Sequence, residues 1–148
     1  MKALLTAVLA AVALAGCAST PRLDDAQRLA LYRAHAGAPV DSFQYFGDLN
    51  GWTPLGDSAL AVWTRPNQAY LLEIRGPCSD LEFASAISVS NQMGRVHARF
   101  DKVTALGAQS IKMPCFIGRI LPLDVKAIKQ AQQEMRSAGT VPRDDAGQ

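Results

Sequence analysis

The sequence predicts an α+β fold: an antiparallel sheet of about five or six strands, open or curled toward a barrel, with a helix at each end of the chain. Three observations carry this prediction. Capping residues followed by apolar residues at helical spacing predict a helix toward each end of the chain. Between them, apolar and polar residues alternate as they do in strands. Pro66 and Asn67 separate two such runs and predict a hairpin.

The first helix is expected to begin after Asp24, whose side chain can accept hydrogen bonds from the free N–H groups of a helix start. It would continue to about His35, because Gly37 directly afterwards is typical of a helix end. Leu29 and Tyr32 share one side of this helix at the required spacing. We therefore expect these two side chains to be buried.

A short strand at residues 43–46 is expected to precede the central hairpin, which comprises residues 60–65 and 69–75. Both arms of the hairpin contain the β-branched and aromatic residues that strands favour. In the second arm the apolar side chains alternate with Glu73 and Arg75. This alternation predicts a sheet with one solvated face.

After the hairpin, Ser79 and Glu82 have the spacing of a capping box, which predicts a short helix ending at about Ser85. Residues 87–89 are apolar or small and predict a further short strand.

Alternation at residues 96–101 and again at residues 111–117 predicts two more strands. Ile120 breaks the odd-numbered alternation of the second of these strands. A bulge at Gly118 would explain this change of face.

The last helix is expected to begin after Asp124, a favourable capping residue. Val125, Ile128 and Met135 lie on one face of it. The tail at residues 137–148 is polar and contains glycine and proline, so we expect it to be disordered.

The N-terminus has the layout of a secretory signal peptide. Lys2 supplies a positive charge, residues 3–15 are apolar apart from Thr6, and small residues precede Cys17. This apolar run is shorter than the roughly 20 residues that a membrane-spanning helix needs. The sequence Leu-Ala-Gly-Cys at residues 14–17 resembles the lipobox of bacterial lipoproteins.

The lipobox resemblance implies that Cys17 carries diacylglycerol and that residues 1–16 are removed. Two or three acyl chains, the palmitate of a typical lipoprotein among them, anchor a protein stably in a membrane. Residues 17–23 would then be a tether, and residues 24–136 a single α+β domain. Ala18 follows the cysteine instead of aspartate, which implies the periplasmic face of the outer membrane of a Gram-negative bacterium. The alternative is a plain secreted protein with a coincidental Cys17.

Lipidation of Cys17 would leave two of the three cysteines, Cys78 and Cys115, as a pair. An exported protein folds in an oxidising compartment, so we expect these two to form a structural disulfide. A redox or metal pair is the alternative. The long spacing and the absence of a Cys-x-x-Cys motif favour the structural interpretation.

The charge balance is close to neutral, with 15 lysines and arginines against 13 aspartates and glutamates. No basic block or RNA-binding signature is present, so we expect no nucleic-acid partner. Near-neutrality also disfavours electrostatic adhesion to a membrane, which leaves the lipid on Cys17 as the expected membrane contact.

Motifs for catalysis are absent from the sequence. Neither Gly-x-Ser-x-Gly nor Ser-x-x-Lys occurs, and His35 and His97 lack the spacing of a zinc pair, so we expect no metal or other cofactor. Asp48 and Asn50 resemble part of a calcium loop, but the downstream carboxylates are missing and a turn is the better interpretation. Paired carboxylates for glycoside cleavage could be drawn from Asp48, Asp57, Glu73, Asp80 and Asp101, a set too common to indicate a site.

One set of residues is a candidate anion-binding surface. Arg95, His97 and Arg99 would form a basic stripe on one face of the strand expected at residues 96–101. The alternative is an ordinary solvated face, on which Asp101 balances the charge. Both interpretations require the two arginines to face solvent.

Residues 60–123 resemble a small family of uncharacterised lipoproteins of Gram-negative bacteria, a domain of unknown function. The resemblance rests on Tyr-Leu-Leu-Glu-Ile at 70–74, Cys-Ser-Asp-Leu at 78–81, Asp-Lys-Val at 101–103 and Cys-Phe-Ile at 115–117. It implies a periplasm-facing lipoprotein in which Cys78 and Cys115 are paired. The family supplies no activity.

We therefore expect a non-enzymatic envelope lipoprotein with a binding, structural or accessory role. Its partner would be an envelope protein or an anionic ligand. One alternative is an inhibitor or chaperone-like module that acts on an envelope protein. The other is a hydrolase with an unrecognised site, which contact of a buried His97 with both a carboxylate and a serine would favour.

Overall fold

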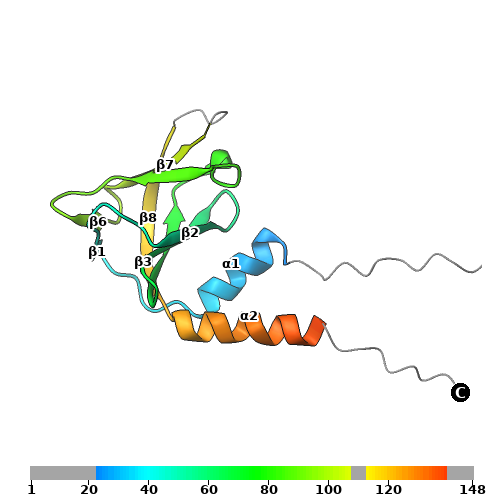
Figure 1. The fold of residues 1–148 in the computed structure, drawn as a ribbon. Helices are drawn as coiled ribbons and strands as arrows, with labels where there is room; N and C mark the ends of the chain where they lie inside the picture. The colour runs from blue at the N-terminus through cyan, green and yellow to red at the C-terminus, as the bar shows by residue number, and fades with distance from the viewer. Residues whose placement is uncertain (1–22, 108–112, 140–148) are drawn as a thin grey trace, which may run out of the picture.

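The structure is a computed structural model that describes residues 23–107 and 113–139. Within this part of the chain, a helix at each end flanks the strands, as Figure 1 shows. The elements are α1 (Asp25–Ala34), β1 (Ser42–Gln44), β2 (Gly51–Pro54), β3 (Ala59–Arg65), β4 (Gln68–Ile74), the 3₁₀ helix η1 (Ser79–Leu81), β5 (Ala86–Val89), β6 (Arg95–His97), β7 (Lys102–Leu106), β8 (Pro114–Leu123) and α2 (Val125–Gly139).

The predicted α+β class is confirmed. Six strands form one antiparallel sheet in the order β2-β3-β4-β8-β7-β5, and β1 pairs with β6 in a separate two-stranded ribbon. The long strand β8 pairs with two strands: its first residues pair with β7 and its later residues pair with β4. Of the two forms expected for the sheet, the open one is observed: within the described residues β2 and β5 are two separate edges, so the sheet does not close into a barrel.

Helix α1 begins as predicted. The Asp24 side chain accepts a hydrogen bond from the Gln27 backbone N–H at 2.7 Å, and the Gln27 side chain accepts one from the Asp24 N–H at 3.1 Å. This reciprocal capping box satisfies two N–H groups that would otherwise lack partners. Leu29 and Tyr32 are buried, as their spacing predicted.

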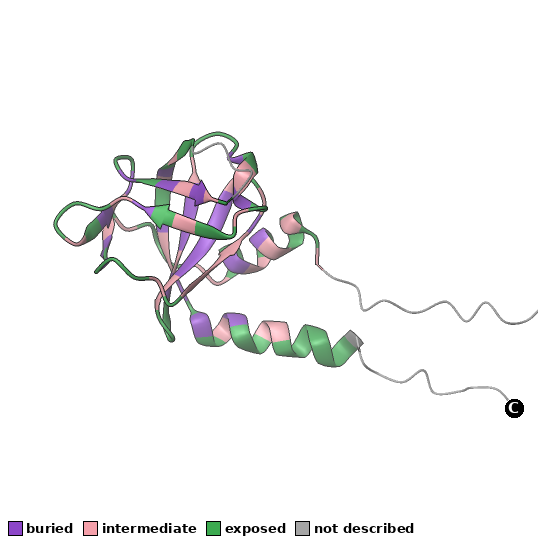
Figure 2. Ribbon diagram, turned by 45° about the horizontal axis from the view of Figure 1, so that its top comes forward, coloured by how far each residue is buried: buried purple, intermediate pink, exposed green. Residues whose placement is uncertain are grey.

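Helix α2 is also capped as predicted, because Asp124 accepts a hydrogen bond from the Ala127 N–H at 2.9 Å. Val125 and Ile128 are buried, whereas Met135 is exposed. Figure 2 shows that burial is confined to the first turns of α2. The helix continues to Gly139, into residues expected in the tail, and residues 140–148 lie outside the described part.

The predicted central hairpin is confirmed as β3 and β4, with Leu60 opposite Leu72. The expectation of one solvated face is wrong for this hairpin, because side chains on both faces are buried. Leu60 and Leu72 belong to one core, while Ala61 and Leu71 belong to a second core. The helices explain the difference, since α1 and α2 cover the face that alternation alone assigned to solvent.

The two cores lie on opposite faces of β3 and β4. The first core joins the hairpin to the β1–β6 ribbon, η1, β5 and β7, through buried residues that include Phe43, Leu81, Val89, Val96 and Val103. The second core joins the hairpin to both helices, through residues that include Leu29, Tyr32, Leu71, Leu123 and Ile128. Among the described residues, no helix is long and apolar enough to span a membrane.

The bulge predicted at Gly118 is confirmed. Arg119 pairs with Glu73 and Ile117 pairs with Ile74, so Gly118 is the extra residue on β8. Ile117 and Ile120 are consequently both buried in the first core. A side chain at Gly118 would lie 3.3 Å from a backbone oxygen of β4, so glycine allows the strands to approach.

Two predictions in the second half of the chain need correction. η1 is a single 3₁₀ turn whose N-cap, Cys78, makes no side-chain capping hydrogen bond, so the capping box expected from Ser79 and Glu82 is absent. The strand expected at 96–101 ends at His97, and β7 forms separately at 102–106.

The predicted disulfide joins Cys78 and Cys115, whose Cα atoms are 6.0 Å apart. Cys78 is buried in the first core directly before η1, and Cys115 is near the start of β8. The bond therefore connects the loop after the central hairpin to the strand that β7 pairs with.

Candidate functional site

The β1–β6 ribbon positions two of the three residues of the predicted basic stripe. Phe43 of β1 pairs with Val96 of β6, and both side chains are buried in the first core. The Phe43 ring stacks on Tyr70 of β4 with centroids 4.4 Å apart. Because side chains alternate along a strand, burial of the middle pair turns Arg95 and His97 to the outer face of the ribbon.

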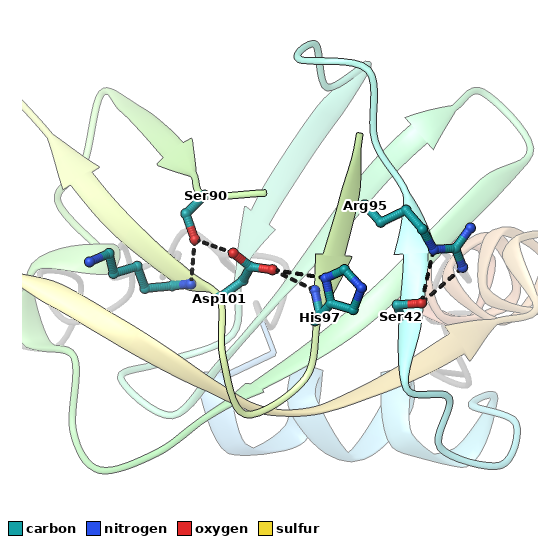
Figure 3. A network of polar contacts seen from close by, with 6 residues as sticks. Ser42, Ser90, Arg95, His97 and Asp101 are labelled. Atoms are coloured by element: carbon teal, nitrogen blue, oxygen red, sulfur yellow. Dashed lines mark hydrogen bonds and ion pairs between the residues drawn. The ribbon is translucent and has the colours of Figure 1, made fainter. Parts of the chain in front are cut away.

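Arg95 is exposed and donates hydrogen bonds to the Ser42 hydroxyl, from Nη2 at 2.8 Å and from Nε at 3.2 Å (Figure 3). Ser42 lies opposite His97 in the ribbon register. The partner of the guanidinium is therefore a neutral group. Its positive charge faces solvent and is free to attract an anion.

Asp101 contacts both the backbone and the imidazole of His97. The backbone N–H of His97 donates to Asp101 Oδ2 at 2.7 Å, and the imidazole Nδ1 lies 3.4 Å from the same oxygen. Asp101 is only 3% exposed. The Ser90 hydroxyl donates to its other oxygen, Oδ1, at 2.6 Å, and the Lys102 N–H donates to Ser90 Oγ at 3.0 Å. Figure 3 shows this chain of contacts running from β7 to the ribbon.

Sequence reasoning missed the role of Asp101, which it placed on a solvated face. The carboxylate instead accepts a backbone hydrogen bond across a tight turn, in which the Asp101 N–H also donates to the His97 carbonyl at 3.0 Å. Aspartate four residues after His97, at the end of a strand, was the available signal, because aspartate commonly bonds nearby backbone in turns.

Arg99 does not share the face of the other two stripe residues, so the expected three-residue stripe is wrong in this respect. It lies in the turn after β6 with a backbone φ of 70°, and its N–H donates to the Ile117 carbonyl at 2.8 Å. The same turn leaves Phe100 exposed, although alternation placed it inward. The Arg99 guanidinium is 3.6 Å from Asp41, in an exposed pair that contributes little to stability.

A shallow cavity of about 250 Å³ lies beside this turn, lined by Arg99, Arg119 and the segment around Val40. Arg119 is already committed to Glu73, with Nε 2.6 Å from Oε2. Arg33 of α1 donates to the other oxygen of the same carboxylate at 2.9 Å. Glu73, expected on a solvated face, is thus buried and forms ion pairs with both arginines, one of which connects α1 to the sheet.

Other titratable groups lie away from the ribbon face. A hydrogen bond with Asp25 raises the pKa of Glu82, and the same bond, together with Arg28, lowers the pKa of Asp25. Burial raises the pKa of Tyr45, with a smaller effect from Asp48, and its hydroxyl donates to the Gly47 carbonyl. These groups connect α1 to the η1 loop and β1 to the following turn.

The contacts of Ser90 decide what chemistry the network can perform. A serine nucleophile needs a base that accepts its proton and is itself oriented by a third group. Ser90 donates to Asp101 and not to His97, so the order of the contacts does not activate it. His35 ends α1 as its C-cap. Among the described residues, no group of three His, Cys, Asp or Glu side chains could hold a metal ion.

The sequence was compared with protein families, curated proteins and solved structures. Residues 1–139 match the model of a family of unknown function, DUF6491. The chain belongs to this family. No curated protein and no solved structure matches it. DUF6491 membership therefore covers both the N-terminal segment with Cys17 and the whole described domain.

Proposed function

We propose that this DUF6491 protein is a non-enzymatic lipoprotein of the bacterial envelope, anchored through Cys17. The disulfide between Cys78 and Cys115 is the observation that supports export most strongly. Disulfides persist in oxidising compartments and are rare in the cytosol. Cys17, in the segment that resembles a lipobox, is the one cysteine left over, and it lies outside the described residues.

The proposed place of the domain is the periplasmic face of the outer membrane. Ala18 after the cysteine favours this membrane over the inner one. The described domain begins a few residues later, at Leu23, so the tether between lipid and fold is short. At no more than about 3.6 Å per residue, such a tether keeps the domain close to the bilayer surface.

The proposed role of the domain is to bind an anionic partner through the outer face of the β1–β6 ribbon. Arg95 supports this role, because its exposed guanidinium contacts a hydroxyl instead of a carboxylate. His97 adjoins it, and its backbone N–H donates a hydrogen bond to the buried Asp101. A ribbon fixed by Phe43 and Val96 in the core presents both groups on a rigid support.

The two alternatives predict different partners. An inhibitor or chaperone-like module would bind one envelope protein, and a pull-down from solubilised envelopes would recover it. A hydrolase is less well supported, since the Ser90 hydroxyl donates its hydrogen bond to Asp101 and not to the imidazole of His97.

The anchor is tested by labelling cells with radioactive palmitate. The wild-type chain and the Cys78→Ser variant should incorporate the label, because both keep Cys17. The Cys17→Ser variant should remain unlabelled and retain residues 1–16, which a mass measurement detects. Label in Cys17→Ser, or none in the wild type, would contradict the anchor.

A further inference from the structure

The two edges of the six-stranded sheet differ in their protection. β2 contains Pro54, which has no N–H group and is typical of a blocked edge. β5, at the opposite edge beside β7, contains no proline. An edge strand without proline, bulge or charge is a template for pairing with another strand.

Alternation of hydrogen bonds identifies the free groups of β5. The Ser90 N–H donates to the Lys102 carbonyl, so the even-numbered residues of this strand face β7. The N–H and C=O groups of Ile87 and Val89 therefore point to the open edge, and among the described residues no hydrogen-bond partner lies on that side. Such groups gain from pairing with a further strand.

Charge distinguishes the possible occupants of this edge. Residues 83–94, which include β5 and its flanks, contain no charged side chain. A charged partner strand would find no complement here, whereas two copies of the same uncharged strand meet without repulsion. The β5 edge is thus suited to pair with the β5 edge of a second copy of the chain.

We propose that β5 pairs antiparallel with β5 of a second copy of the chain, about a two-fold axis at Ser88. This register places Ile87 opposite Val89 of the second copy, so the free backbone groups at the two edges pair with each other. Because the same patch serves both subunits, the contact closes as a dimer and does not extend into a filament.

Two exposed apolar residues flank the strand in a way that fits this axis. Phe83 lies five residues before Ser88 and is 85% exposed, and Met93 lies five residues after it and is fully exposed. The two-fold arrangement brings Phe83 of each copy toward the Met93 end of the other. Contact between sulfur and an aromatic ring would add to the pairing.

Disulfide cross-linking tests the register directly. Ser88 would lie opposite its own counterpart in a non-hydrogen-bonded pair, with Cα atoms about 4.5 Å apart, which suits a disulfide. Ala86 is a matched control, because it is exposed on the same face but would lie opposite Ser90 of the second copy. With a mild oxidant, the full-length Ser88→Cys chain should give a covalent dimer several times more abundantly than Ala86→Cys.

A charge swap tests whether the pairing itself holds the dimer. Ser88→Lys and Ser88→Asp each place like charges opposite one another, and each should raise the dissociation constant about tenfold or more in sedimentation experiments. Mixing the two variants should restore a dimer containing one of each. Ser88→Thr, which adds no charge, should dimerise like the wild type.

The cross-linking and charge-swap results together decide whether β5 pairs with β5 of a second copy. Preferential cross-linking at Ser88 with rescue in the mixture supports the proposal. A monomeric wild-type chain, equal cross-linking of the Ser88→Cys and Ala86→Cys variants, or a dimer indifferent to Ser88→Lys overturns it. Because none of these readouts uses the anchor or the anionic partner, failure here leaves the proposed function unaffected.

Discussion

The two halves of the large sheet are stabilised differently. Around β3 and β4 both faces are covered, with Leu72 in the core toward the ribbon and Leu71 in the core under the helices, each fully buried. Around β7 only one face is covered. Val103 is buried there, while Lys102 lies exposed on the other face beside Phe116.

The disulfide occurs in the half that lacks the helices. Cys115 lies opposite Val103 of β7, and its bond to Cys78 closes a loop of 37 positions. A covalent link there compensates for the missing second layer, since closing a loop of this length restricts the unfolded chain. One half of the sheet is thus stabilised by burial on both faces, and the other half by a covalent cross-link.

The two surfaces proposed for recognition lie away from α1 and α2. The ribbon with Arg95 and His97 covers the opposite face of the sheet from α1 and α2, and the open edge of β5 borders β7. These surfaces depend on backbone geometry and exposed groups instead of deep burial. Substitutions in them should therefore affect binding more than folding.

The largest effect is expected from the helix-covered half. Leu71→Ala removes a fully buried side chain from the core between β4 and the helices. It should lower the free energy of unfolding by about 4 kcal/mol, measured by urea titration. Thr104→Ala, on the half-buried side of β7, is the control and should cost far less. Equal losses of unfolding free energy in the two variants would contradict the difference between the two halves of the sheet.

The next effect is expected from the cross-linked half. Replacing both cysteines in the Cys78→Ala/Cys115→Ala variant should lower the free energy of unfolding by about 3 kcal/mol. Adding reductant to the wild type should reproduce this loss, whereas the double variant should not respond to reductant. A double variant as stable as the wild type would show that the helix-free half does not depend on the bond.

The smallest effect on stability is expected from the ribbon and the turn that follows it. Arg95→Glu combined with Arg99→Glu changes exposed side chains and should alter the free energy of unfolding by less than about 0.5 kcal/mol. Recovery of the anionic partner in a pull-down should nevertheless be lost. Lys126→Glu with Lys129→Glu changes the net charge equally on α2 and should leave recovery intact. Loss of partner in proportion to loss of folded protein would make the two arginines structural.

Local signals were sufficient for much of the fold. Asp24 and Asp124 mark helix starts through their own hydrogen bonds with nearby N–H groups, and the hairpin around Pro66 is a short-range feature. Gly118 marks its bulge because the alternation changes face there. Each of these depends on residues close in sequence, which is why it could be predicted.

Long-range features were not predictable in the same way. Glu73 alternates like a solvated residue, and only the packing of α1 against the sheet makes it buried between two arginines. β7 was not expected as a separate strand, and its pairing with β5 on one side and β8 on the other places it in the sheet. Asp101 and Arg99 leave the expected strand because the chain turns after His97.

The candidate site was predicted only in part for the same reason. Alternation correctly placed Arg95 and His97 on one face, since both lie within β6. It could not reveal the support from Asp101, which approaches from the other side of a turn. Pairing of the cysteines was predictable because only two remain once Cys17 is assigned to lipid.

The half of the sheet that α1 and α2 do not cover is held by the bond between Cys78 and Cys115. Alkylation of the native protein isolated from cells, with and without reductant, followed by mass analysis of its peptides, tests this claim most directly. We predict that neither cysteine is alkylated until reductant is added, and that both are alkylated afterwards. Alkylation of both in the unreduced native protein would contradict the account.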